Sequence, residues 1–173
     1  MEHYGTLAEA DAYHAARGRT AWEEAAEQAR TAALIVASDY LDGRYRYQLN
    51  GCWRSMFSGS KTAGRAQERE WPRTGAKDSA GEPIPADEVP AEIQRATYEA
   101  AYRELTEAGS LSPDYVPGGQ VTREKVGPVE VSYAAPQVVD GIPPNMPVIP
   151  VIDGILGGLL CQRVSVGIGV RVV

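Results

Sequence analysis

Apolar side chains recur every three or four residues between Trp22 and Tyr40, and no other feature of the sequence constrains the fold as strongly. This spacing is that of one face of an α-helix, and it predicts a helix that runs from about Trp22 to Leu41. One amphipathic helix cannot bury its apolar face alone, so the chain must supply partner helices. The stripe consists of Trp22, Ala26, Ala29, Ala33, Val36 and Tyr40.

Two further segments have the pattern of partner helices. Residues 6–17 open with Thr6 and Glu9 at the spacing of a capping box, in which each side chain accepts a backbone N–H at the helix start. The same spacing from Thr20 to Glu23 predicts the start of the second helix. A third helix is expected from Pro90, which suits the first helical position, to Gly109. These signals predict three packed helices.

Residues 43–89, between the second and third helices, lack helical periodicity and are rich in Gly, Ser, Pro and charged residues. An ordered loop of this length is unusual in a compact domain and is typically functional or mobile. The net charge of the chain is -6, yet residues 43–77 carry 8 basic and 2 acidic side chains. Residues 1–42 and 78–108 carry an excess of acidic side chains. Positive charge is therefore concentrated in one segment.

Aromatic and basic side chains alternate within residues 43–77. Proteins that bind single-stranded nucleic acid combine these side chains, because rings stack on bases and cations neutralise phosphates. Protein interfaces are enriched in the same residue types. Acidic helices flank the loop and would repel nucleic acid, which favours a protein partner. The loop side chains predicted to make a contact are Arg44, Arg46, Trp53, Arg54 and Phe57.

The pattern after residue 118 changes from helical to alternating. Residues 120–134 are predicted to form a short β-hairpin, followed by a proline-rich connector and a short helix over residues 151–160. The last ten residues alternate apolar and small or polar side chains. An apolar strand at a chain end is a liability unless something covers it, so this arm is expected to pair with a neighbouring subunit or partner. Its apolar positions are Val164, Val166, Ile168, Val170 and Val172.

Side chains that would mark an enzyme are sparse. The chain has two histidines, His3 and His14, and two cysteines, Cys52 and Cys161, and neither cysteine lies in a CxxC pair. No phosphate-binding loop of the Walker type occurs. No apolar run is long enough to span a bilayer, and the first residues lack the pattern of a signal peptide. We therefore expect no enzymatic activity, no metal, no cofactor and no membrane partner, and a protein that stays inside the cell.

Together these patterns predict a mainly α fold: a small helical bundle with a long irregular loop, a short β-hairpin and an extended C-terminal arm. Residues 1–135 are expected to form the helical body, with the loop 43–89 and the hairpin 120–134 inserted in it. Residues 136–173 are expected to form the proline-rich connector and the arm.

Several segments, taken together in their order and spacing, resemble a family of tailed-phage and prophage proteins. The family is often labelled DnaT-like single-stranded-DNA-binding, and it resembles the helical head-to-tail connector (adaptor) proteins. The resemblance covers residues 1–133. The segments that carry it are Tyr4-Gly5-Thr6 with residues 9–18, Ala33-Leu34-Ile35 with Asp39-Tyr40-Leu41-Asp42, Trp71-Pro72-Arg73-Thr74-Gly75, Asp87-Glu88-Val89-Pro90 and Glu124-Lys125-Val126-Gly127-Pro128.

The resemblance implies a structural adaptor in the neck of a virion, between head and tail, that is made in the host cytoplasm. Such an adaptor forms a homo-oligomeric ring, a dodecamer, beneath the portal protein, and it joins a tail or stopper protein. DNA passes through its channel without specific binding, and an acidic net charge suits such a conduit. The alternative hypothesis is a replication accessory protein that binds single-stranded DNA through the basic aromatic loop 43–77.

Overall fold

Five α-helices form the body of the protein in the part of the chain that the computed structural model describes, which is residues 2–113, 123–126, 129–132 and 147–161. Three of them lie where the periodicity predicts helices. The fifth, α5, overlaps the short helix predicted over residues 151–160 and begins one residue before it. The helices are α1 (Leu7–Ala15), α2 (Thr20–Glu23), α3 (Glu27–Arg44), α4 (Ala91–Thr106) and α5 (Pro150–Leu156).

The helix ends follow the sequence signals only in part. The capping box is confirmed: the Thr6 side chain accepts from the backbone N–H of Glu9, and the Glu9 carboxylate accepts from the backbone N–H of Thr6. Pro90, predicted as the first helical residue, is instead the N-cap of α4. The prediction that Thr20 caps a helix is wrong, because Thr20 is the first residue of α2 and Arg19 precedes it without a side-chain cap.

The stripe between Trp22 and Tyr40 is divided between two helices instead of one. The backbone is extended at Ala26 (φ -60°, ψ 144°), between the end of α2 and the start of α3. This break lets Trp22 pack against α1, where its indole N–H donates to Asp11 (2.8 Å) and its ring lies 4.2 Å from that of His14. The packing of a large buried aromatic ring therefore overrides the continuous helical pattern.

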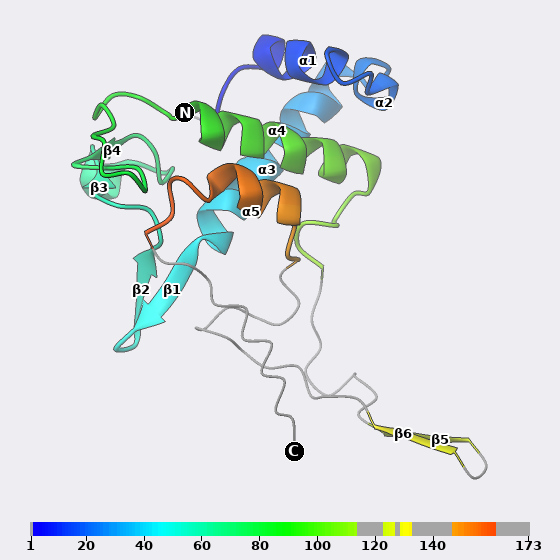
Figure 1. Ribbon diagram of the computed structural model, residues 1–173. Coiled ribbons are helices and arrows are strands. Elements are labelled where there is room, and N and C mark those ends of the chain that lie inside the picture. The colour runs from blue at the N-terminus through cyan, green and yellow to red at the C-terminus, as the bar shows by residue number, and fades with distance from the viewer. Residues whose placement is uncertain (1, 114–122, 127–128, 133–146, 162–173) are drawn as a thin grey trace.

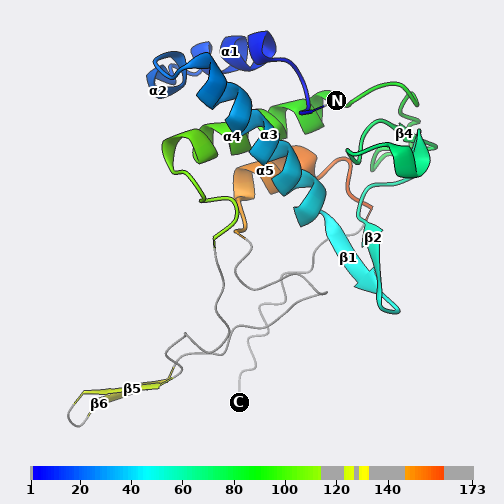
Figure 2. The same ribbon diagram turned by 180° about the vertical axis from the view of Figure 1, so that it is seen from behind.

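The hydrophobic core lies where α3 crosses α4, with α5 against the side of α4 that faces away from α1 and α2 (Figures 1 and 2). Trp22, Leu34 and Ile93 are fully buried or nearly so. Ile152 and Leu156 of α5 are fully buried in the same core. Each such side chain contributes roughly 1.5–3 kcal/mol by leaving water. Helix α5 is therefore part of the packed body.

The segment predicted as an irregular loop contains strands. Strands β1 (Arg46–Leu49) and β2 (Cys52–Ser55) form an antiparallel hairpin that extends from the C-terminal end of α3 (Figure 1). The turn is Asn50-Gly51, and both residues have positive φ (52° and 76°), as a type I′ turn requires. Strands β3 (Ser60–Lys61) and β4 (Arg73–Thr74) form a second short pair, and a 3₁₀ turn spans Gly64–Ala66.

Strands β5 (Arg123–Val126) and β6 (Val129–Ser132) pair within the region predicted as a hairpin, with Val126 opposite Val129. Five helices together with three strand pairs in the described residues make the fold mixed α and β, so the expectation of a mainly α fold, a small helical bundle with one short hairpin, is corrected. The five apolar positions predicted for the arm, from Val164 to Val172, lie outside the described residues. The division into body and arm stays a prediction.

Candidate functional site

A buried polar cluster fixes the loop before β4 onto α3. The Tyr4 hydroxyl donates to Asp42 Oδ1 (2.5 Å) and accepts from the backbone N–H of Trp71 (3.2 Å). Asp42 also accepts from the backbone N–H of Glu70 (3.3 Å). Burial, together with the nearby Asp42 carboxylate, raises the pKa of Tyr4 far above its usual range, so its hydroxyl remains a donor. The cluster ties the N-terminus, α3 and the loop together.

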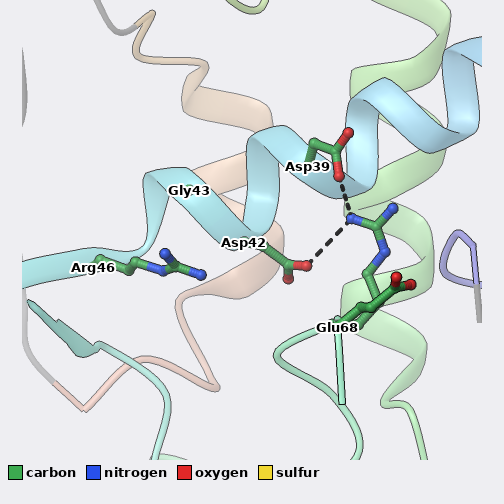
Figure 3. Close-up of a pocket in the computed structure, with 6 residues that line it drawn as sticks. Asp39, Asp42, Gly43, Arg46 and Glu68 are labelled. Atoms are coloured by element: carbon green, nitrogen blue, oxygen red, sulfur yellow. Dashed lines mark hydrogen bonds and ion pairs between the residues drawn. The ribbon is translucent and has the colours of Figure 1, made fainter. Parts of the chain in front are cut away.

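Arg69 extends this cluster toward the surface. Its guanidinium lies 2.5 Å from Asp39 Oδ1 and 3.4 Å from Asp42 Oδ2, and its Nε donates to the backbone carbonyl of Glu2. Figure 3 shows Asp39 and Asp42 on successive turns of α3, with both carboxylates turned toward this guanidinium. Arg69 is 8% exposed, and its positive charge is neutralised by these two carboxylates within the fold.

Glu70 is the centre of a second group of ion pairs. Its carboxylate lies 2.7 Å from Arg73 Nη1, 3.2 Å from Arg46 Nη2 and 3.5 Å from Lys61 Nζ. Arg73 also donates to the backbone carbonyls of Ser58 and Gly59, at 2.7 Å each. Three cations from different parts of the segment therefore converge on one buried carboxylate and hold β1, β3 and β4 together.

A cleft of about 550 Å³ lies between the C-terminal half of α3 and the loop (Figure 3). Its cations, Arg46 and Arg69, are both engaged in the ion pairs described above. The cleft therefore offers no free cation, among the described residues, to an anionic ligand. The residues that line it are Asp39, Asp42, Gly43, Arg46, Glu68 and Arg69.

The β1–β2 hairpin presents the most exposed apolar surface of the segment. Trp53 is 49% exposed and Leu49 is 50% exposed. Gln48 lies opposite Trp53, and Tyr47 lies opposite Arg54. Neighbouring side chains of a strand point to opposite faces, so Trp53 and Arg54 flank β2. Arg54 is exposed and has no ion pair within the described residues. An exposed aromatic ring and a free cation therefore follow one another along a projecting ribbon, on its opposite faces.

The predicted contact residues of the loop are distributed between surface and core. Trp53 and Arg54 are exposed, and Arg46 is partly exposed but paired with Glu70. Arg44 and Phe57 are each 4% exposed. Arg44 lies in the last turn of α3, and the Phe57 ring packs between those of Tyr45 and Trp71. Burial of Arg44 and Phe57 therefore speaks against a direct contact between these two side chains and a partner.

The structural roles of Glu70 and Asp42 were not predicted from the sequence. A signal for Glu70 was present, because only two acidic side chains, Glu68 and Glu70, occur among the eight basic ones of residues 43–77. Asp42 gave no local signal, because its partners Tyr4 and Arg69 are distant in the sequence.

No three His, Cys, Asp or Glu side chains are grouped as a metal site requires in the part of the chain that the structure describes. Among the described helices, none has the length and apolar character needed to cross a membrane.

The whole chain, residues 1–173, matches a family described as "putative DnaT-like ssDNA binding protein". No curated protein and no solved structure matches the chain. Tyr4, Asp42 and Trp71 belong to three of the segments on which the sequence resemblance rests, and they meet in the buried polar cluster. At these three positions the shared pattern therefore serves the fold, and a binding surface must be sought elsewhere on the molecule.

Proposed function

The chain belongs to this DnaT-like family, and we propose that it binds single-stranded DNA through the β1–β2 hairpin. One observation carries the proposal: half-exposed Trp53 and exposed Arg54 are consecutive residues of a ribbon that extends from the helical body. An aromatic ring with a neighbouring cation is the combination that binds single strands without reading their sequence.

The geometry of the strand suggests how DNA would lie. Because Trp53 and Arg54 point to opposite faces of the hairpin, the DNA would cross the outer edge of β2. One base would stack on the Trp53 ring, and an adjacent phosphate would lie near the Arg54 guanidinium. Stacking of this kind contributes about 1–3 kcal/mol per base. This arrangement tolerates any base, since every base has a π face.

The number of free cations limits the electrostatic contribution to the free energy of DNA binding. Within residues 43–77, Arg54, Arg65 and Lys77 are exposed and have no ion pair in the described part of the chain. If all three contact phosphates, the logarithm of the binding constant should fall with the logarithm of salt concentration with a slope of about -2. We therefore propose weak binding of moderate salt dependence.

Replacing Trp53 by alanine should weaken binding to a labelled oligothymidine by about 2 kcal/mol, or roughly thirtyfold, because the stacked base loses its platform. Fluorescence anisotropy at low salt measures the change. Trp53→Phe keeps a ring and should retain most of the affinity. Both variants should keep the helical circular dichroism signal, because the side chain is half exposed. Equal affinity of Trp53→Ala and the unaltered protein would overturn the proposal.

A second candidate function is the structural head-to-tail adaptor of a tailed phage or prophage. It is favoured because few of the basic side chains in residues 43–77 are free to contact DNA. Of these eight, Arg44 is buried and four others are ion-paired within the fold. The net charge of -6 also disfavours tight DNA binding. We propose for this case a homo-oligomeric ring, a dodecamer, that contacts a portal protein and a tail or stopper protein in the virion neck.

Quantitative mass spectrometry of purified particles from the source tests this second candidate. The adaptor function predicts a copy number equal to that of the portal protein, because the two rings would match. Absence of the chain from particles, with the protein present in infected cells, would overturn it and leave single-strand binding as the better proposal.

A further inference from the structure

His14 is a fully buried titratable side chain at the point where α1, α2 and α4 meet. Its ring centroid lies 4.2 Å from that of Trp22 in α2 and 5.5 Å from that of Tyr102 in α4. The neighbouring Tyr13 ring meets it edge-on, with 5.4 Å between the centroids. A charge on this imidazole would therefore act on the junction between α1, α2 and the rest of the body.

The hydrogen bonds of His14 leave no place for a second proton. Arg19 Nη1 lies 3.3 Å from Nδ1 of the imidazole. A guanidinium can only donate, so Nδ1 accepts and the neutral ring carries its hydrogen on Nε2, which is buried and has no hydrogen-bond partner among the described residues. A second proton would sit on Nδ1, facing the Arg19 donor. Protonation therefore replaces a hydrogen bond with a contact between two cations.

The two carboxylates that act on this imidazole are already matched by cations. Glu99 of α4 lies 2.7 Å from Arg19 Nη2 and 3.7 Å from Arg17 Nε. Asp11 lies 2.7 Å from Arg30 Nη1 of α3. Repulsion between an imidazolium and Arg19 would therefore weaken the Arg19–Glu99 ion pair, which ties the chain between α1 and α2 to α4.

The chain on either side of α1 and α2 is suited to act as a hinge. We call residues 6–25 the α1–α2 segment. Before it, Tyr4 is fully buried and its backbone N–H donates to Ser38 of α3 (3.1 Å). Gly5 (φ 70°) follows this anchor, and Ala26 is extended at the other end. Small residues outside helices can absorb the backbone rotations of a hinge, so the segment can move while both of its ends stay attached.

We infer that protonation of His14 releases the α1–α2 segment from α4 as one unit, while α3, α4 and α5 stay packed. The core of the remaining body does not need the segment, because Leu34, Ile93 and Ile152 lie in these three helices. The inference concerns an acid-sensitive conformational change and does not depend on DNA binding.

Release would uncover an aromatic face of α4. Tyr98 packs against Tyr13 of α1, with 5.4 Å between the ring centroids. Tyr102 packs against His14 and lies under the Arg19 guanidinium (4.4 Å). Both tyrosines lose these neighbours when the segment moves away. The acid form would therefore present tyrosine side chains that the segment covers at neutral pH.

The pH range follows from the difference between the two forms of His14. Burial, together with Arg19, lowers its pKa from 6.5 to about 4 in the closed form. In the released segment the imidazole is in water and its pKa returns to the ordinary value. Protons therefore bind the open form preferentially below pH 6.5. The ratio of open to closed protein should rise about thirtyfold between pH 7.5 and pH 5.

Amide hydrogen exchange in the full chain tests the inference, with rates corrected for the intrinsic effect of pH on exchange. We expect the helical amides of the α1–α2 segment to exchange about thirtyfold faster at pH 5 than at pH 7.5. At pH 5 they should also exchange roughly tenfold faster, or more, than the most protected amides of α3 and α4, which open only when the whole protein unfolds. Exchange of the segment at the same rate as these amides would show global unfolding alone and would overturn the inference.

His14→Phe keeps an aromatic ring and cannot bind a proton, so the exchange rates of its α1–α2 segment at the two pH values should be nearly equal. His14→Gln gives the same readout if the phenyl ring does not fit. His3→Ala is the control and should keep a rise of about thirtyfold, because His14 is still present. A rise of that size in both His14 variants would contradict the inference.

Arg19→Gln tests the contact at Nδ1. Glutamine can accept a hydrogen bond from a protonated ring, so the rise between pH 7.5 and pH 5 should fall to roughly tenfold or less. The comparison uses this ratio because loss of the Arg19–Glu99 ion pair also raises exchange at pH 7.5. Arg95→Gln is the matched control: Arg95 is exposed on α4 and paired with Glu92, so the full rise should remain. An undiminished rise in Arg19→Gln would show that protonation does not act through Arg19, against the inference.

Discussion

Replacement of Glu70 by alanine is expected to lower the free energy of unfolding by about 3–5 kcal/mol, the usual loss when one partner of a buried ion pair is removed. The Glu70 side chain is 9% exposed and the Arg73 side chain is 4% exposed. Without Glu70, the Arg73 guanidinium would keep only backbone carbonyls as partners. Its positive charge would then remain buried without an opposite charge.

Urea denaturation followed by tryptophan fluorescence measures this loss. Glu68→Ala is the matched control, because Glu68 lies in the same loop and is exposed, and its replacement should change stability by less than about 0.5 kcal/mol. Glu70→Gln keeps the shape of the side chain and should fall between the two. Similar losses for Glu68→Ala and Glu70→Ala would contradict the central position of Glu70.

Substitution of Glu70 should also loosen the attachment of the β1–β2 hairpin to the body. Arg46 is the first residue of β1 and donates to Glu70 (3.2 Å), so the ion pair fixes the base of the β1–β2 ribbon against the body. A stable but loosened Glu70→Gln protein would then bind DNA less well if the hairpin is the binding element, although Glu70 itself touches no ligand.

Helix positions could be predicted from the sequence because their signals are local. The capping box at Thr6 and Glu9 and the apolar stripe of α4 both involve residues three or four positions apart. The break at Ala26 could not be predicted in this way. It depends on Trp22 packing against His14 and donating to Asp11, which are contacts with another helix.

The strands of the long segment were not predicted, because most of them leave only a weak signal in the sequence. These strands are two to four residues long and carry polar and charged side chains, so they show little alternation. The Asn50-Gly51 hairpin signal was nevertheless present in the sequence. The mixed α and β character of the fold follows from these short strands.

The distribution of charge along the sequence was a poorer guide to the structure than the distribution of apolar residues. A count of basic side chains along residues 43–77 suggested a positive surface, but the pairing partners lie elsewhere in the chain. Arg69 pairs with Asp39 and Asp42, which belong to α3. Only the folded structure shows that half of these cations neutralise carboxylates within the fold and that, of the predicted contact residues, Trp53 and Arg54 are the exposed ones without an ion pair among the described residues.

Acidification from pH 7.5 to pH 5 should lower the free energy of unfolding by about 2 kcal/mol through His14 alone. His14 is fully buried, packed against the rings of Trp22 and Tyr102. Burial, together with the nearby Arg19 guanidinium, lowers the pKa of His14 from 6.5 to about 4, although the Glu99 carboxylate opposes the shift. The unfolded chain therefore binds a proton between pH 6.5 and pH 4 that the folded protein excludes, so stability is complete above pH 6.5 and is lost as the pH falls toward 4.

Urea denaturation at a series of pH values between 5 and 7.5 measures this loss. His14→Phe keeps an aromatic ring in the same packing and cannot bind a proton, so its stability should be nearly constant over the range. His14→Gln, which is smaller and also does not titrate, provides a second test if the phenyl ring does not fit. His3→Ala should retain the loss, because His14 is still present. A pH dependence that survives in both His14 variants would assign it to other groups and contradict the prediction.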